Sequence, residues 1–191
     1  MVDVEKAAGA IAELLIALGV QDDENTRDTP RRVAEAWQEA LVGYEEDPRV
    51  HLSQKFSGPS EPGLVMISRI RVVSTCAHHL LPIVGMATVA YRPQSGDKVV
   101  GLSKLVRLVK GYSRRLQLQE HLGYEISTAI QQSLNPIGSA CIISARHECM
   151  TWRGIEEDST TTTQALAGGW RAGDPDVQTV LEEHYRSARG A

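Results

Sequence analysis

Residues 64–73 read LVMISRIRVV, and this stretch decides the fold class of the chain. It is rich in β-branched residues and alternates polar with apolar side chains near its end, a pattern typical of a β-strand. A second stretch of the same character runs from Ile83 to Arg92. Only residues 74–82 separate the two, which predicts an antiparallel pair of strands.

Helical patterns precede this pair of strands. Apolar residues recur at three- and four-residue steps from Val4 to Leu18, which predicts a first helix. A second helix is expected to begin with Thr29 as its N-cap and Pro30 in its first turn, and to end at Gly43. Residues 44–63 are rich in proline, glycine and polar groups, which indicates a loop before the main domain.

The second half of the chain again mixes helices and strands. Two helices are predicted over residues 102–109 and 118–134, where apolar residues are spaced by three and four. A third strand is predicted from Ala140 to Ala145, and a fourth within the threonine-rich residues 151–165. The tail from Asp174 to Arg189 has a weak helical pattern.

This order predicts an α+β fold, with a four-stranded antiparallel sheet, two helices on one face and an N-terminal helical extension. We divide the chain into N-terminal helices with a connecting loop (1–60) and a main domain with a C-terminal tail (61–191). A sheet of so few strands has two open edges, and open edges are a liability unless they are paired. The sequence therefore predicts an oligomer.

Composition excludes several classes of protein. Of 191 residues, 42% are hydrophobic and 23% charged, which permits a core and excludes wholesale disorder. With 20 Lys and Arg against 24 Asp and Glu, the net charge of −4 gives no basic field for nucleic acid. No apolar run reaches the ~18 residues of a membrane helix, and the first residues lack a signal-peptide pattern. We expect a cytoplasmic protein, and three cysteines are too few for a disulfide scaffold.

Cysteine and histidine gather after two of the predicted strands. Cys76 and His79 follow the first strand with C-x-x-H spacing, and Cys149 follows the third strand, two residues after His147. Thiolate and imidazole are the ligands that zinc prefers, and a tight turn lets both residues of C-x-x-H reach one metal. Three protein ligands leave a fourth position open, which is typical of a catalytic site.

The phase of the third strand bears on this site. If the strand continues, alternate residues from Cys141 to Cys149 share one face, so that His147 and Cys149 point the same way. A redox pair of Cys76 and Cys149 is the alternative to a metal site. We interpret Cys141 as a small buried hydrophobic residue.

Two histidines, His78 and His147, remain beside the predicted metal. Next to an activated water they are natural general acid–base groups. The alternative is that one of them only orients a metal ligand through a hydrogen bond.

Two further segments carry polar groups that suit a ligand. Ser103 is expected to cap a helix whose first turns hold Lys104 and Arg107, a combination that suits an anion such as phosphate. The alternative there is a solvated basic face. Glu120, which follows Gln119 at the start of the next helix, either caps that helix or accepts two N–H donors from one edge of a guanine.

Several blocks of the sequence together resemble GTP cyclohydrolase I. They are CAHHLLP at 76–82, GLSK at 101–104, RLQLQE at 115–120, HECM at 147–150 and Arg153-Gly154. Their order and approximate spacing match that family from Thr29 to about Gly169. The combination is specific to that family.

The resemblance implies the tunnelling fold. In that family, subunits pair sheet edges into pentameric rings, and two rings stack as a homodecamer with active sites at subunit interfaces. The implied reaction turns GTP and water into formate and 7,8-dihydroneopterin triphosphate, with Zn²⁺ as the cofactor. Zinc would lower the pKa of a bound water towards ~7, and a histidine would protonate the ring nitrogen that departs from C8 of guanine.

The resemblance also implies roles for individual residues. The zinc ligands are Cys76, His79 and Cys149. The acid–base residues are His78 and His147, with Ser103 as a further candidate for proton transfer. The guanine-binding position is Glu120, with Gln119 beside it. The residues near ribose and triphosphate are Ser103, Lys104, Arg107 and Arg153, with Arg32 lent by a neighbouring subunit.

The sequence departs from the family pattern at several positions. Ala77 stands where the family usually has Glu, Glu148 where it has Met, and Glu35 where a basic residue is common. One hypothesis is that Glu148 restores the charge lost at Ala77, although strand alternation would turn it away from Cys149. Two alternative functions stay open: another tunnelling-fold enzyme acting on a purine or pterin in a specialised pathway, and a zinc-stabilised binding protein without catalysis.

Overall fold

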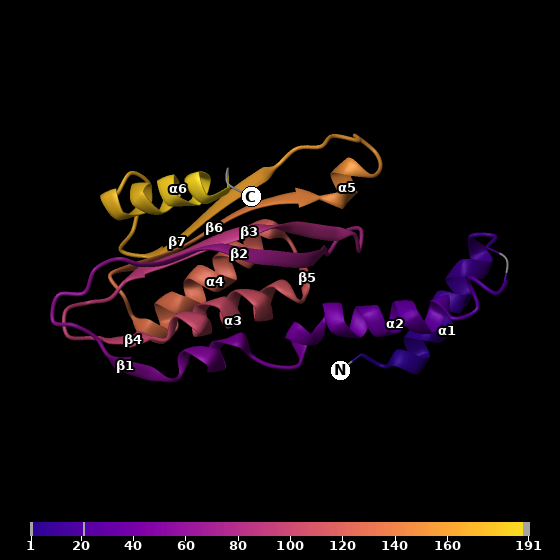
Figure 1. Cartoon of the computed structure of the whole chain (residues 1–191), viewed down its shortest axis with the longest axis horizontal. Coiled ribbons are helices and arrows are strands. Elements are labelled where there is room, and N and C mark those ends of the chain that lie inside the picture. The colour runs from indigo at the N-terminus through magenta and orange to yellow at the C-terminus, as the bar shows by residue number, and fades with distance from the viewer. Residues whose placement is uncertain (1, 21, 189–191) are drawn as a thin grey trace.

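The computed structural model describes residues 2–20 and 22–188, and a five-stranded sheet in the order β5-β2-β3-β6-β7 lies at its centre (Figure 1). The strands are β2 (Val65–Cys76), β3 (Pro82–Arg92), β5 (Leu116–Gln117), β6 (Gly138–His147) and β7 (Thr161–Gly168). Helices α3 (Leu102–Ser113) and α4 (Gln119–Leu134) cover one face of this sheet. The predicted α+β class is confirmed.

The four long strands pair antiparallel as predicted, β2 with β3, β3 with β6 and β6 with β7. The short strand β5 is an addition that the sequence analysis did not predict. It runs parallel to the end of β2, with Gln117 opposite Cys76. Because α4 begins two residues later, at Gln119, this pairing brings the start of α4 beside the end of β2.

Two hydrophobic cores lie on the two faces of the sheet. Because side chains alternate along a strand, Cys141 and Ile143 face the core under α3 and α4, whereas Ala140 and Ile142 face the second core. The last helix, α6 (Pro175–Ala188), covers that second face with Val177, Val180 and their neighbours. The weak pattern of the tail is therefore a helix on the face opposite to the two predicted helices.

The N-terminal helices α1 (Val4–Ala17) and α2 (Thr29–Ala40) pack on each other and extend away from the sheet (Figure 1). The N-cap of α2 is Asp28, so the prediction of Thr29 as the cap is wrong by one residue. Two short 3₁₀ turns, η1 (Val42–Tyr44) and η2 (Pro48–Leu52), lead to β1 (Lys55–Ser57), which pairs with β4 (Lys98–Val100).

The division of the chain at residue 60 stays a prediction. Leu52, on the N-terminal side of that boundary, is fully buried in the core under α3 and α4. No helix within residues 2–20 and 22–188 combines the length and the apolar character needed to cross a membrane.

Candidate metal and substrate site

A closed turn shapes the segment that follows β2. The N–H of Cys76 donates to the carbonyl of Leu81 (2.8 Å), and the N–H of Leu80 donates back to the carbonyl of Cys76 (2.9 Å). The N–H of Ala77 donates to the carbonyl of Gln117 in β5 (3.0 Å), which ties the turn to the sheet. Leu80 has a φ of 57°, in the left-handed region that a leucine rarely adopts. This turn holds His79 close to Cys76.

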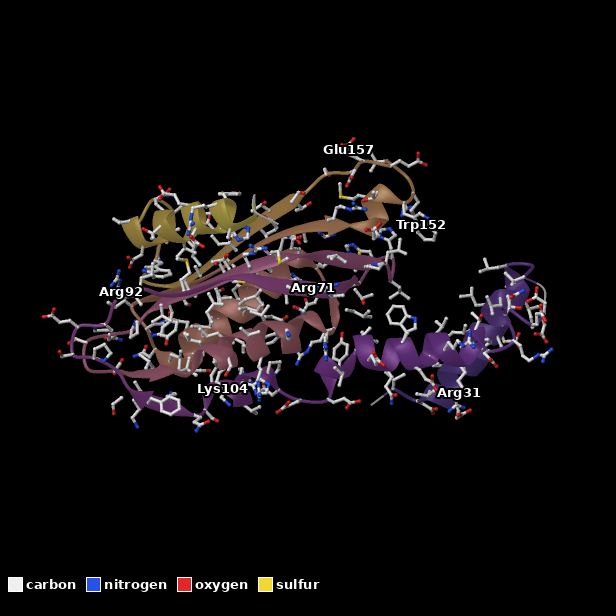
Figure 2. All side chains as sticks on the ribbon, viewed as in Figure 1. Arg31, Arg71, Arg92, Lys104, Trp152 and Glu157 are labelled. Carbon is white, nitrogen blue, oxygen red and sulfur yellow. The ribbon has the colours of Figure 1, made fainter. Side chains whose placement is uncertain are left out.

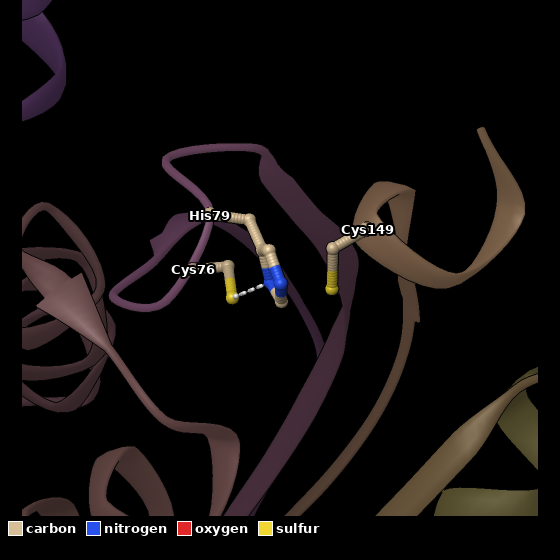
Figure 3. Close-up of side chains that lie close together, drawn as sticks. All are labelled: Cys76, His79 and Cys149. Carbon is tan, nitrogen blue, oxygen red and sulfur yellow. Dashed lines mark hydrogen bonds between the residues drawn. The ribbon is translucent and has the colours of Figure 1, made fainter. Parts of the chain in front are cut away.

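Three potential metal ligands meet at this turn. The Sγ of Cys76 lies 3.8 Å from Nδ1 of His79, and the ligand atoms of Cys76, His79 and Cys149 all lie within 4.8 Å of one another (Figure 3). A tetrahedral metal with bonds of about 2.0–2.3 Å holds its ligand atoms roughly 3.5–3.8 Å apart, so small shifts would close the site. Two sulfurs and a ring nitrogen fit one metal ion, and these three leave a coordination position open.

Cys149 reaches the site by a different route from the one predicted. Strand β6 ends at His147, and Cys149 lies on the helical turn α5 (Glu148–Thr151). The condition under which His147 and Cys149 would share one face of a strand is therefore not met. Burial raises the pKa of the Cys149 thiol and the nearby Cys76 thiol adds to this, while the charge of Arg153 opposes it. A bound metal would lower the pKa of this thiol again, because a coordinating cysteine is deprotonated.

His147 stands next to this cluster and is tethered by α4. It is half-buried, and its Nε2 lies 2.7 Å from Oε1 of Gln119. Burial lowers the pKa of His147, and the negative charge of Glu120 opposes that shift. His78 is exposed, with its ring centroid 6.1 Å from that of His79. Both predicted acid–base residues therefore lie where β2 and β6 end, a region that we call the metal end of the sheet.

The first two residues of α4, Gln119 and Glu120, differ in how their side chains are exposed. Gln119 is buried, and its side chain is hydrogen-bonded within the chain, whereas Glu120 is exposed. The N-cap of α4 is Leu118, and no side chain caps this helix. The alternative in which Glu120 serves as the cap is therefore not supported.

The predicted phosphate-binding residues of α3 lie at the other end of the sheet. The N–H of Val100, just before α3, donates to Oη of Tyr91, which stands opposite the first residue of β2. Because β3 spans 11 residues with a rise of ~3.4 Å each, its two ends lie roughly 34 Å apart. Figure 2 shows Lys104 far from Trp152, the residue that ends the turn carrying Cys149. Within one chain, Ser103, Lys104 and Arg107 do not join the metal cluster.

Arg32 and Arg153 are the other two residues that were expected near the phosphates. Arg32 lies on α2, where it is exposed and paired with Asp28 (3.2 Å), so the chain itself does not bring it to the cluster. Arg153 lies near enough to Cys149 to affect its pKa. Ser103 is not the cap of α3, because Gly101 holds that position.

The unusual residue Glu148 has an ion-pair partner close to it along the chain. The carboxylate of Glu148 pairs with Arg146 (3.3 Å), which also pairs with Asp158 (3.3 Å). The hypothesis that Glu148 replaces the missing carboxylate at Ala77 is therefore not supported. Cys141 is fully buried, as interpreted from the sequence, and burial raises the pKa of its thiol.

The contacts of the Gln119 side chain are a feature of the site that the sequence did not predict. The Nε2 of Gln119 lies within hydrogen-bond distance of the carbonyls of Ile143 and Thr161 and of Oγ1 of Thr163. Two of these three acceptors are backbone carbonyls, and only Oγ1 of Thr163 is a side-chain atom.

The fold and the cluster together define an α+β protein with a candidate three-ligand metal site beside a tethered histidine. The family model described as GTP cyclohydrolase I matches residues 7–185 of the chain. This protein belongs to the GTP cyclohydrolase I family of enzymes.

Individual relatives are similar over most of their length. The chain is 45% identical over 170 residues to GTP cyclohydrolase 1 of Carboxydothermus hydrogenoformans, covering 88% of each chain. It is 43% identical over 187 residues to GTP cyclohydrolase 1 of Corynebacterium glutamicum, covering 95% of each. A solved structure of the archaeosine synthase QueF-Like in the apo form aligns with a TM-score of 0.44 at 18% identity, covering 60% of this chain and 98% of that one.

Proposed function

We propose that this protein acts in the cytoplasm and converts GTP and water to formate and 7,8-dihydroneopterin triphosphate. The observation that carries the proposal is the Cys76–His79–Cys149 cluster in a chain of the GTP cyclohydrolase I family. His147 and Glu120 lie beside this cluster, so groups for proton transfer and for binding guanine are close to the ligands of the metal.

The chemistry of the cluster favours Zn²⁺ as the resident metal. Two thiolates and an imidazole suit zinc better than they suit harder cations such as magnesium. When bound, zinc lowers the pKa of a water ligand towards ~7 and so supplies hydroxide near neutral pH. The part of Cys76, His79 and Cys149 is to hold the ion and to leave one position open.

We assign proton transfer to the two histidines at the metal end. Opening of the imidazole ring of guanine needs a proton on the departing nitrogen, and re-closure onto the opened ribose needs further transfers. His147 is half-buried and hydrogen-bonded, which suits transfer at a fixed position. His78 is exposed beside His79 and suits exchange with water.

Glu120 is the residue that we propose for binding guanine. Its carboxylate is exposed, next to the buried Gln119, and accepts hydrogen bonds from the N–H groups on one edge of guanine. Arg153, close to Cys149, then stands near the ribose and phosphates.

The remaining phosphate-binding residues come from a second chain in this proposal. Ser103, Lys104 and Arg107 lie on α3, which begins at the end of β3 opposite to the metal end, and Arg32 lies on α2. We propose that subunits assemble as a homodecamer of two pentameric rings. Two features support association between chains. One is the pair of sheet edges, at β7 and at the part of β2 that β5 leaves open. The other is the exposed apolar surface of α1 and its C-cap, made by Leu14, Ile16 and Leu18.

The test is to incubate the zinc-loaded protein with GTP and to measure formate and the pterin chromophore. Equal amounts of both products are expected. Binding of GTP without either product would instead indicate a non-catalytic relative. Turnover of a pterin or deazaguanine without formate release from GTP would indicate another enzyme of this fold.

A further inference from the structure

The side-chain amide of Gln119 is held in one orientation. The residue is 1% exposed, and its Nε2 lies 3.0 Å from the carbonyl oxygen of Ile143 and 3.0 Å from that of Thr161. Carbonyl oxygens only accept, so the nitrogen of the amide faces them. The hydroxyl of Thr163 lies 3.1 Å from the same nitrogen. A flipped amide would set its oxygen against two carbonyl oxygens, neither of which can donate to it.

This orientation decides which nitrogen of His147 carries the proton in the neutral ring. Oε1 of Gln119 lies 2.7 Å from Nε2 of His147. Because an amide oxygen only accepts, the Nε2–H of His147 donates this bond. A neutral imidazole has a single N–H, so Nδ1 is left as the nitrogen with a free lone pair. The bond also survives protonation of the ring, because Nε2 keeps its hydrogen in both states.

We infer that Gln119 is a positioning residue that holds His147 in the Nε2–H tautomer and directs proton exchange with the substrate to Nδ1. The tautomer follows from the contacts of the chain, while the link to the substrate rests on the proposed function. This role differs from guanine binding, which the resemblance implied for Gln119 beside Glu120. Both ends of the amide are already used within the chain, and Thr161 and Thr163 of β7 help to hold it.

The tautomer is tested directly by solid-state ¹⁵N NMR of the zinc-loaded protein labelled with [¹⁵N]histidine. The chain has 6 histidines, and the spectrum of His147→Asn identifies the signals of His147 by their loss. We expect a protonated Nε2 and an unprotonated Nδ1 for the neutral ring. An Nδ1–H signal, or a mixture of the two tautomers, would overturn the inference.

The role in catalysis is tested by Gln119→Met, which keeps the length of the side chain but removes the amide. We expect kcat for GTP to fall at least about tenfold while KM changes less than about threefold, because a positioning residue acts through His147. Gln131→Met is the matched control, since Gln131 lies on the same helix and bonds to the carbonyl of Pro136, away from the site. Its kcat and KM are expected to stay within about twofold.

A raised KM with unchanged kcat in Gln119→Met would make Gln119 a substrate contact and overturn the inference. If Gln119→Met does not fold, the spectrum of the unaltered protein alone decides for or against the tautomer. If the unaltered protein does not turn over GTP, the proposed function fails, and the same spectrum still decides the tautomer.

Discussion

The two ends of the central sheet differ in how much of the proposed active site each one provides. Where β2 and β6 end, the ligand atoms of three potential metal ligands lie within 4.8 Å of one another, and Gln119 tethers His147. At the other end, Lys104 and Arg107 stand on the first turns of α3, and neither has an ion-pair partner among the described residues. We call these regions the metal end and the basic end.

The difference reflects what each kind of binding demands. Metal coordination fixes ligand atoms to within a few tenths of an ångström, so a closed turn and the sheet register hold Cys76 and Cys149. Charge attraction between cations and a triphosphate acts over longer distances and tolerates flexible side chains. A chain can therefore complete its metal end alone and leave the basic end to serve another copy.

The largest effect is expected when the metal end is broken by Cys149→Ser. A serine hydroxyl is a poor zinc ligand, so we expect less than ~0.1 metal per chain and a loss of GTP turnover of at least about 10³-fold. Elemental analysis and a formate assay measure both. The control is Cys141→Ser, the same change at a buried thiol outside the cluster, which should lower stability but keep the metal. Stoichiometric zinc in Cys149→Ser would remove Cys149 from the site.

A smaller loss is expected from Glu120→Gln, which leaves the metal end intact but alters its guanine contact. We expect kcat/KM for GTP to fall by about 10²- to 10³-fold, because guanine donors lose a charged acceptor. The melting temperature should hardly change, because the carboxylate is exposed. Glu182→Gln, an exposed change on α6, is the control. Equal turnover of GTP and inosine triphosphate, which lacks the exocyclic amine, by the unaltered protein would count against this role.

His184 provides a test of the stability of the fold that does not involve either the metal end or the basic end. His184 lies on α6, and its buried ring faces the sheet, with Nδ1 2.9 Å from Oγ1 of Thr88 and Nε2 2.8 Å from Oγ of Ser144. Burial lowers the pKa of His184. Because the pKa in the folded state lies below the unfolded value of about 6.5, the unfolded chain binds more protons as the pH falls below that value. Stability contributed by the neutral ring is thus lost on acidification.

Thermal unfolding at pH values from about 7.5 to 5 measures this effect. The melting temperature of the unaltered protein should fall more steeply than that of His184→Gln, by a few degrees. Comparing the two proteins removes the part of the pH dependence that comes from the metal ligands. Parallel curves would show that acid sensitivity lies elsewhere in the chain.

The smallest effect is expected from Glu148→Met. Since the carboxylate of Glu148 pairs with Arg146, we expect metal content and GTP turnover to stay within about twofold of the unaltered protein. Ala77→Glu, made alone and together with Glu148→Met, completes the comparison. A tenfold loss of turnover in Glu148→Met that Ala77→Glu repairs would revive the idea that Glu148 replaces the missing charge.

The metal end was largely predictable because its signals are local. C-x-x-H after one strand and His-x-Cys after another place three ligands at strand ends, and antiparallel β3 links those ends. The route of Cys149 was not predictable, because periodicity alone does not say where β6 stops and α5 begins. The cap of α3 was assigned to Ser103 for a similar reason, since a glycine can also hold that position.

The contacts of Gln119 lay beyond sequence reasoning. They join the first turn of α4 to the backbone of Ile143 in β6 and of Thr161 in β7, elements far apart along the chain. Only the register of β6 with β7 and the unpredicted strand β5 bring these groups together. The separation of Lys104 from Cys149 was not predicted either, because the helical pattern after residue 101 does not show at which end of the sheet α3 begins.

The central claim is that one active site uses the metal end of one chain and the basic end of another. The most direct test mixes two variants, Lys104→Ala and Cys149→Ser, each with little activity on its own. Assembled together at equal amounts, they should recover up to about a quarter of the activity of the unaltered protein, because random pairing places both intact ends at that share of sites. Activity of the mixture no greater than the sum of the two variants would contradict the claim.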